Sequence, residues 1–261
     1  MTRFLILFFS LFSNLAFAAP KADLWSFWNS SNAQSSTIIS HQKWQYFLDS
    51  YLVRQGEYVL VKYNKVTNED KNNLKSYLSD LAMTSPTKLN KAEQYAYWVN
   101  LYNALTIDLI LDNYPLKSIT KLGGLFSFGP WDDDIIKIQG KTMSLNDIEH
   151  RILRPIWKDP RTHYAVNCAS FGCPNLQQQA FTAENSEVLL ELAAKEFINS
   201  DKGVLVKKGQ TELSSIYDWF AVDFGGEEKL IGHFSQYRAN LPDSLGKINY
   251  EYDWSLNEIK R

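Results

Sequence analysis

The chain has 261 residues, a formal net charge of −2 and two cysteines. A chain of this length can bury a large apolar core, so it needs neither a disulfide nor a metal ion to fold. Its 27 basic and 29 acidic residues leave no excess of positive charge of the kind that nucleic-acid-binding proteins carry, and we expect no nucleic-acid partner.

The first eighteen residues have the order of features that a secretory signal peptide requires. Arg3 gives a short positive region, residues 4–12 form a nearly unbroken apolar run, and Ala16 and Ala18 place small residues before a cut after Ala18. The apolar run is too short to span the roughly 30 Å of hydrocarbon in a bilayer. We therefore predict an exported protein, periplasmic or extracellular, with no transmembrane segment in the mature chain.

Residues 19–261 are predicted to form one helix-rich domain. Apolar spacing and capping boxes predict helices over residues 41–53, 67–83, 91–113, 144–154, 182–199 and 227–237. Alternation and turn signals predict short strands at residues 58–63, 135–138, 141–143, 163–167, 204–206 and 211–213. Because helices dominate and the strands are short and irregularly spaced, the predicted fold class is α+β. Short β-hairpins or a small antiparallel sheet would pack on a central buried helix at about residues 93–113.

The central helix has a polar face inside an otherwise apolar surface. Glu93, Asn100 and Asn103 share one face by three- and four-residue spacing. A helix that is apolar on most sides is buried, and buried amides must find partners. Asn100 and Asn103 are therefore predicted either to bind the backbone of neighbouring loops or to orient a catalytic imidazole or a substrate.

Both cysteines lie in one segment, at Cys168 and Cys173. One interpretation is a reactive thiol at Cys168, in a loop that follows a predicted strand. A second is a disulfide between the two cysteines, which an exported protein permits. Such a disulfide would close a short loop, contribute little stability through loop entropy, and be open to reduction as a redox-active pair. An inert buried thiol is the third interpretation.

A cysteine nucleophile needs a base to take its proton. His163 precedes Cys168 by five residues, which in a strand separates them by about 16 Å and puts them on opposite faces. His150, which lies beside Glu149 on a different predicted element, is the better candidate. The alternative for His150 is an ordinary surface position on a helix.

Other common site motifs are absent from the sequence. The acidic run at residues 131–134 lacks the spaced ligands and the glycine of a calcium loop. There is no phosphate-binding loop, no Gly-x-Ser-x-Gly elbow and no His-Glu-x-x-His sequence. We expect no metal site and no cofactor.

Several segments, in order, resemble the family called domain of unknown function 547. They are residues 97–106, 144–154, 159–174 and the later residues 219–224. The resemblance covers about residues 58–224, and bacterial members of the family look like exported single-domain proteins.

The resemblance gives weight to particular residues. They are Asn100, Asn103, Glu149, His150, Arg154, His163 and Cys168. The family pattern is looser at Cys173, where serine can stand, and this implies a functional Cys168 rather than an obligatory disulfide.

The first functional hypothesis is a thiol-dependent amide hydrolase or transferase. Cys168 would attack the carbonyl, and His150 would act as general base and then as acid. Glu149, Asn100 or Asn103 would hold the imidazole, as a third group does in papain-like proteases. Binding roles would fall to His163, Arg154 and Ser170, the last through a backbone amide facing the oxyanion.

The second hypothesis is a non-enzymatic protein that binds an unidentified small-molecule, peptide or cell-envelope ligand. Its polar residues would then form a structural network or a recognition pocket. A third is a thiol–disulfide role for Cys168 and Cys173, although their spacing differs from the two-residue spacing of thioredoxin-like motifs.

Overall fold

The computed structural model describes residues 20–124, 128–207 and 209–259. The predicted signal peptide, residues 1–18, lies outside these ranges and stays a prediction. The α-helices are α1 (Gln42–Tyr51), α2 (Asn68–Met83), α3 (Lys91–Asn113), α4 (Arg154–Trp157), α5 (Thr162–Ala165), α6 (Ser186–Asn199), α7 (Ile216–Trp219) and α8 (Leu230–Phe234). A π-helical segment, Asp147–Leu153, leads directly into α4. Short 3-10 helices cover Ser26–Asn29, Tyr63–Lys65, Pro86–Lys88, Ile119–Lys121 and Glu227–Lys229.

The strands form three small sheets. They are β1 (Leu52–Gln55), β2 (Tyr58–Val61), β3 (Ile136–Ile138), β4 (Lys141–Met143), β5 (Val204–Lys207), β6 (Gln210–Ser214) and β7 (Lys247–Glu251). Antiparallel hairpins join β1 to β2 and β3 to β4, and a third hairpin joins β5 to β6. The last strand, β7, lies parallel to β6 and completes a three-stranded mixed sheet. The predicted α+β fold class is confirmed.

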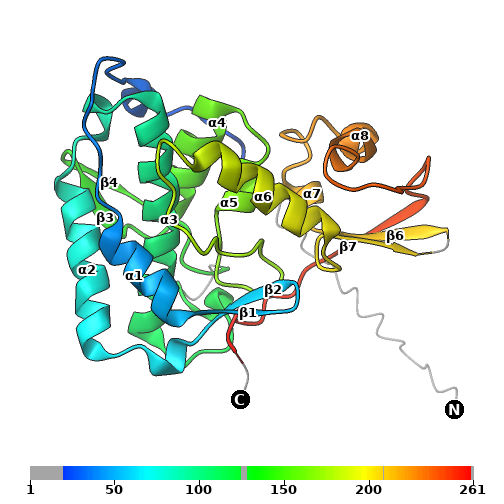
Figure 1. Cartoon of the computed structure of the whole chain (residues 1–261), viewed down its shortest axis with the longest axis horizontal. Helices are drawn as coiled ribbons and strands as arrows, with labels where there is room; N and C mark the ends of the chain where they lie inside the picture. The colour runs from blue at the N-terminus through cyan, green and yellow to red at the C-terminus, as the bar shows by residue number, and fades with distance from the viewer. Residues whose placement is uncertain (1–19, 125–127, 208, 260–261) are drawn as a thin grey trace, which may run out of the picture.

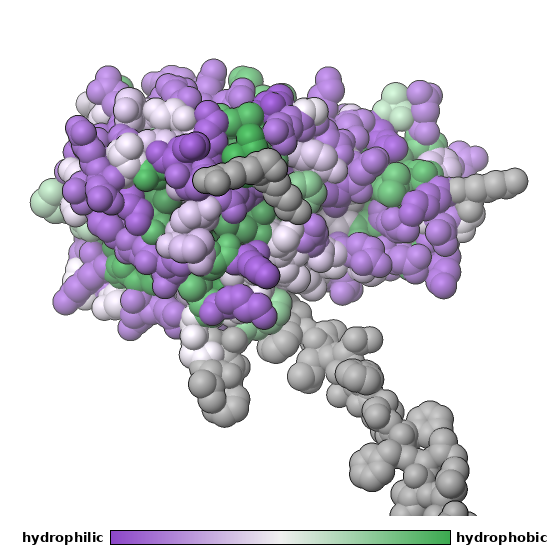
Figure 2. All heavy atoms as spheres, turned by 90° about the horizontal axis from the view of Figure 1, so that it is seen from below, coloured by the Kyte–Doolittle hydropathy of each residue, from purple (hydrophilic) through white to green (hydrophobic). Residues whose placement is uncertain are grey.

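Helices α1, α2 and α3 and the largest sheet occupy opposite ends of the molecule. In Figure 1, α1, α2 and α3 gather at the left, α6 crosses the middle, and β6, β7 and α8 lie at the right. One large apolar core surrounds α3, and a second joins α6 to the three-stranded sheet, α7 and α8. Seen from below, the surface is mostly hydrophilic, with separate hydrophobic areas over the helical end and near the β5–β6 end (Figure 2).

The predicted central helix is confirmed as α3. Its first turn is capped by Asn90, whose side-chain oxygen accepts a hydrogen bond from the amide of Glu93 at 2.9 Å. Every residue from Glu93 to Ile107 is buried. The helix is therefore surrounded on all sides, and each polar side chain on it needs a partner inside the protein.

The two asparagines of α3 bind the backbone of other segments. Asn100 donates to the carbonyl of Phe181 at 2.7 Å and accepts from its amide at 3.0 Å. Asn103 donates to the carbonyl of Ala165 at 2.9 Å and accepts from the amide of Asn167 at 2.8 Å. This is the structural interpretation of the two residues. Within the described part of the chain neither amide bonds to an imidazole, so the orienting role proposed for them is not formed.

The helix predicted at residues 182–199 begins only at Ser186, and the one predicted at 227–237 is a 3-10 turn followed by α8, which ends at Phe234. Three other element predictions were wrong in detail. The strand predicted at residues 163–167 is the helical turn α5. It forms because Asp159 accepts from the amides of Arg161 and Thr162, which starts a helix over Pro160. The helix predicted to end before Pro155 continues to Trp157.

The third error lies at the first predicted helix. It ends at Tyr51, and the following residues form β1 because Leu52–Gln55 pairs with Tyr58–Val61 across a turn at Gly56. The φ of Gly56 is +60°, a conformation that favours glycine. Pairing in a local hairpin thus ended the helix earlier than the apolar spacing predicted.

Asn103→Ala should reduce the free energy of unfolding by about 2–4 kcal/mol, since it leaves a buried carbonyl and a buried amide without partners. Urea denaturation monitored by circular dichroism measures this change. Asn113→Ala is the matched control, because Asn113 is an exposed asparagine of the same helix that bonds only to its own helix backbone. The control should change stability by about 0.5 kcal/mol or less. Equal losses in the two variants would contradict the role of the buried amide.

Candidate functional site

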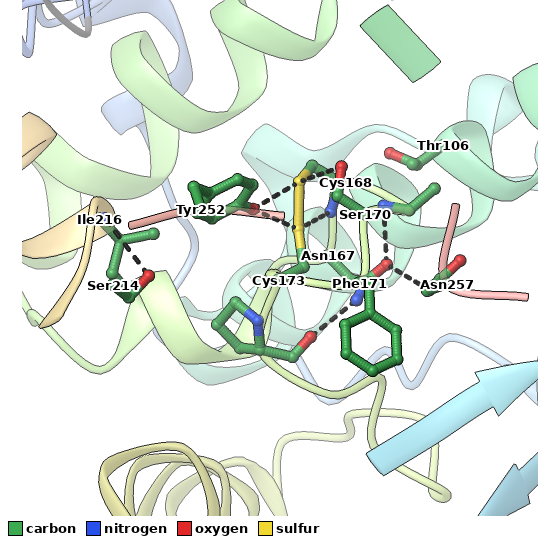
Figure 3. Close-up of a disulfide and its surroundings, with 12 residues drawn as sticks. Thr106, Asn167, Cys168, Ser170, Phe171, Cys173, Ser214, Ile216, Tyr252 and Asn257 are labelled. Carbon is green, nitrogen blue, oxygen red and sulfur yellow. Dashed lines mark hydrogen bonds between the residues drawn. A yellow bond between two sulfur atoms is a disulfide. The ribbon is translucent and has the colours of Figure 1, made fainter. Parts of the chain in front are cut away.

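The segment after α5 turns back on itself and carries both cysteines. Ala169 has a φ of +58°, in the left-handed region, and the turn brings the Cα atoms of Cys168 and Cys173 to 6.2 Å. The two sulfurs form a disulfide (Figure 3). Cys173 is 3% exposed, whereas Cys168 is only partly buried. Cys168 is therefore the more exposed residue of the pair.

Asn167 and a C-terminal segment hold the disulfide loop in place (Figure 3). The Asn167 side chain accepts from the amide of Ala169 at 2.9 Å and donates to the carbonyl of Pro174 at 2.7 Å. Backbone bonds then join Phe171 to Ser255 and Gly172 to Asp253. A Cβ at position 172 would lie 2.9 Å from the Asp253 amide nitrogen, so this close approach requires glycine.

Both sulfurs receive hydrogen bonds. A disulfide sulfur carries no hydrogen, so the Tyr252 hydroxyl is the donor to Cys168 at 3.1 Å and to Cys173 at 3.0 Å (Figure 3). The amide of Cys168 lies 2.9 Å from the sulfur of Cys173. The buried Ser170 hydroxyl lies 3.6 Å from the Cys168 sulfur. The hydrogen-bond donors around the Cys173 sulfur therefore lie closer to it than the donors around the Cys168 sulfur lie to that atom.

Lys202 fixes the other side of the same loop. Its ammonium donates to the carbonyl of Cys173 at 2.6 Å and to the side-chain oxygen of Asn175 at 2.9 Å. Burial lowers the pKa of Lys202 to about 7, and the charges of Glu57 and Glu196 only partly offset this effect. No sequence pattern pointed to this residue, because it lies far along the chain from the cysteines.

A buried ionic cluster lies next to the disulfide. Asp223 is its centre, and its Oδ2 accepts from Nε of Arg154 at 2.5 Å and from Nε2 of His163 at 2.7 Å. Nη1 of Arg154 also bonds Nδ1 of His150 at 3.0 Å. Nδ1 of His163 lies 3.7 Å from a carboxylate oxygen of Glu149. Except for the half-buried Asp223, all members of this ionic cluster are buried.

The π-helical segment places Glu149, His150 and Arg154 in this arrangement. Pro155 has no amide hydrogen, and the amide of Arg154 bonds to the carbonyl of Glu149 five residues back. The absent amide hydrogen of Pro155 leaves backbone carbonyls of this segment open to acceptance from outside the helix. The amides of Asp23 and Trp25 bond to the carbonyls of His150 and Arg151 at 3.0 and 2.9 Å. The N-terminal segment thus completes the helix that carries the ionic cluster.

The charges of the ionic cluster are set by burial and by one another. Burial acts to raise the pKa of Glu149, but His150, His163 and Arg154 outweigh it, and the pKa falls to about 2. Burial likewise opposes the ionisation of Asp223, yet its bonds to His163 and Arg154 lower its pKa. Both carboxylates are ionised at neutral pH.

His150 is neutral and has a defined tautomer. Burial is the largest influence and lowers its pKa to about 4. Because Arg154 can only donate, Nδ1 of His150 must accept, which leaves the proton on Nε2. Its free ring nitrogen is thus a donor and not a base. Phe220 covers the two histidines, with its ring stacked on His163 at 4.1 Å between centroids.

The structure does not form the expected pair of Cys168 and His150. Within the described residues, the side chains bonded to the Cys168 sulfur are Cys173, Ser170 and Tyr252, and the ring nitrogen partner of His150 is Arg154. The expected oxyanion site is also altered. The amide of Ala169 is already bonded to Asn167, and Ser170 is buried in a bridge to Leu256.

Tyr252 connects the disulfide to the ionic cluster. Burial raises its pKa, and the negative charge of Glu149 raises it further. The tyrosine therefore stays protonated and able to donate. Sequence reasoning missed Tyr252 and Asp223 as site residues. Asp223 stood in one of the family-like segments, at residues 219–224, but its histidine and arginine partners come from other segments.

The described residues set two further limits. Within them, no group of three or more His, Cys, Asp and Glu side chains is arranged to hold a metal ion. Every described helix is too short or too polar to cross a bilayer.

The fold and the site define an α+β protein in which a partly exposed disulfide lies beside a buried ionic cluster. The family model described as "Protein of unknown function, DUF547" matches residues 86–198, and this region of the chain is similar to that family. The matched range is shorter than the resemblance at residues 58–224 indicated. It contains both cysteines and the whole ionic cluster except Asp223. Comparisons with curated proteins and with solved structures gave no match.

The burial of neutral His150 predicts a stability that falls in mild acid. Between pH 6.5 and about 4 the unfolded chain binds a proton that native His150 does not, so stability decreases as the pH falls. When the pH falls from 7.5 to 4.5, this histidine should lower the free energy of unfolding by about 2–3 kcal/mol, at 1.36 kcal/mol per pKa unit. Urea unfolding at several pH values measures the slope.

His150→Asn is the matched variant, because an amide oxygen replaces the Nδ1 acceptor for Arg154 without titrating. Its stability should depend less on pH over the same range. Buried His41, whose pKa burial also lowers to about 4, contributes equally to both proteins. Parallel slopes for the variant and the parent would show that His150 is not a buried neutral group.

Proposed function

We propose that the Cys168–Cys173 disulfide is the reactive centre and that the protein acts in thiol–disulfide exchange. The observation that carries this proposal is the asymmetry of the two sulfurs. Cys168 is partly exposed, whereas Cys173 is buried and receives hydrogen bonds from the Cys168 amide and from Tyr252. Exchange depends on access to the attacked sulfur and on the stability of the departing thiolate. The geometry favours attack at Cys168 with departure of Cys173.

The exchange step is a displacement at sulfur. A partner thiolate forms a bond to Sγ of Cys168, the bond between Cys168 and Cys173 breaks, and its electron pair leaves on Sγ of Cys173. The two donors at 2.9 and 3.0 Å then stabilise the new thiolate. A second thiolate of the partner then attacks the partner's own sulfur in the mixed disulfide, the bond to Cys168 breaks with its electron pair left on Sγ of Cys168, and the partner is released as a disulfide. The protein is then a dithiol, and the partner pair has lost two electrons.

The proposal predicts different reactivity for the two cysteines once each stands alone. In Cys173→Ser, the remaining Cys168 should react with iodoacetamide at least about tenfold faster than the remaining Cys173 of Cys168→Ser, since access controls thiol reactivity. Cys173→Ser should also form a stable mixed disulfide with glutathione. Mass spectrometry of the labelled peptides measures both. Equal labelling rates, or faster labelling at Cys173, would contradict the proposal.

The role of Tyr252 in stabilising the departing Cys173 thiolate is tested by the rate at which glutathione reduces the oxidised protein. Tyr252→Phe removes the hydroxyl donor but keeps the ring, and reduction by glutathione should slow several-fold, since a hydrogen bond to a charged group contributes about 1.5–3 kcal/mol. Tyr250→Phe is the control, because its hydroxyl bonds to the exposed Glu227 and not to sulfur. If Tyr252→Phe, like the control, is reduced as fast as the parent protein, the Tyr252 hydroxyl has no role in the exchange step.

The amide hydrolase hypothesis makes other demands on this centre. It needs a reduced Cys168 and a base, whereas the neutral His150 presents a donor nitrogen and bonds to Arg154. Peptide hydrolysis by the reduced protein that is lost in Cys168→Ser would support the hydrolase. Exchange activity without hydrolysis supports the redox function.

We also propose that the protein works outside the cytoplasm after removal of residues 1–18. The charged start, apolar run and small residues before the cut support export. A disulfide is also typical of oxidising compartments. N-terminal sequencing of protein recovered from a periplasmic extract should begin at Ala19. Recovery of the uncut chain from the cytoplasm alone would refute export.

A further inference from the structure

A concave pocket lies at the outer edge of the ionic cluster, away from the disulfide. It encloses about 480 Å³, within the roughly 300–1,000 Å³ of pockets that hold small organic ligands. We call it the Lys158 pocket. Its apolar lining comes from Ala22, Leu24, Pro155 and Val222, and its charged lining from Arg154, Lys158, Asp159 and Asp223.

The charges of the Lys158 pocket leave one cation unpaired. Asp223 is bonded to Arg154 at 2.5 Å and to His163 at 2.7 Å. Asp159 is paired with Arg161, with two contacts at 2.6 and 3.0 Å. Within the described residues, the side chain of Lys158 makes no hydrogen bond or ion pair, and Lys158 is exposed. The two cations and two anions of the lining balance, and the ammonium of Lys158 is the lining cation whose side chain is left open to a ligand.

The backbone of Lys158 is held in an unusual conformation for its residue type. It ends α4 with a φ of 54° and a ψ of 33°, the left-handed region in which helix ends usually carry glycine or asparagine. A lysine there is strained relative to glycine, and backbone strain of this kind clusters at binding sites. This is a second observation, independent of charge, at the same residue.

Two exposed apolar side chains stand at the rim of the pocket. Val222 is 88% exposed and Leu24 is 45% exposed. They come from segments far apart in the sequence, the loop after α7 and the N-terminal segment. An aliphatic ligand lying between them would remove apolar surface from water, which is the main source of affinity for such groups.

We infer that the Lys158 pocket binds a monoanion with an aliphatic body, a carboxylate whose charge meets Lys158 and whose chain meets Val222 and Leu24. The same chemistry is offered by a free alkyl acid and by the C-terminus of an apolar peptide. This binding site is separate from the disulfide. Its presence or absence is therefore decided independently of thiol exchange.

Isothermal titration calorimetry of the purified protein with octanoate tests the inference. Octanoate should give saturable binding, whereas octylammonium and octanol, which keep the chain but reverse or remove the charge, should bind at least about tenfold more weakly, as expected for loss of a charge-assisted hydrogen bond. No binding of octanoate, or equal binding of the three probes, would overturn the inference.

Matched variants assign the binding to this pocket. Lys158→Gln should weaken octanoate binding roughly tenfold, whereas Lys158→Arg and Lys137→Gln, at an exposed lysine of β3, should retain it. Val222→Ser should weaken binding, and Val188→Ser, at an exposed valine of α6, should not. Octanoate binding that is unchanged in both Lys158→Gln and Val222→Ser would place the ligand elsewhere and refute the site.

Lys158→Gly separates binding from folding. Glycine adopts the left-handed conformation without strain, so the melting temperature should stay the same or rise while octanoate affinity falls. A fall in melting temperature together with unchanged octanoate affinity would overturn the role of Lys158.

The source of the ligand is decided by two capped peptides. One peptide is acetyl-Val-Leu with a free C-terminal carboxylate, and the other is its carboxamide. If the carboxylate peptide binds more tightly than octanoate and the carboxamide does not bind, the natural ligand is a peptide C-terminus. Tighter binding of octanoate identifies a free alkyl acid.

Discussion

The burial of α3 is the constraint on which the site depends. A helix surrounded on all sides cannot leave its amide side chains to water, so Asn100 and Asn103 must bond to whatever segments cross them. The segments they bind are the ones that lead into and out of the disulfide loop. Asn103 joins the end of α5 to Asn167, one residue before Cys168. The polar face of a core helix thereby fixes the position of a surface disulfide.

The ionic cluster extends this connection by charge. Asp223 bonds a histidine from α5 and an arginine from α4, and so joins the loop after α7 to both of these helices. Removing one member would leave an uncompensated buried charge, which costs far more than the pair contributes when intact. Glu149 then faces both His163 and Tyr252, so the cluster and the disulfide share an electrostatic environment.

Sequence reasoning located the elements that local patterns define. The apolar spacing of α3, the capping box of Thr67 before α2, and the hairpin of β3 and β4 all depend on neighbours within a few residues. It also identified Glu149, His150, Arg154 and His163 as polar residues of interest, and the structure brings these four together. It mistook α5 for a strand, because a single helical turn begun by Asp159 and Pro160 is too short to show a helical period.

What the sequence concealed were the partners. Asp223 and Tyr252 acquire their roles from contacts with residues 60 to 84 positions away, and no periodicity or spacing rule reaches that far. The protonated nitrogen of His150 depends on Arg154 in the same way, since only the folded geometry shows which nitrogen must accept. The prediction that His150 serves as a base for Cys168 failed to take account of that bond.

The strand-like bonds between the disulfide loop and residues 253–257 have a consequence for the order of synthesis. Both cysteines leave the ribosome, and any translocation channel, well before the segment that covers Phe171 and Gly172. During that interval the turn at Ala169 and the side chain of Asn167 are the local means of holding the two sulfurs near each other. The dithiol is therefore open to an oxidant on the nascent chain until Tyr252 and its neighbours cover it.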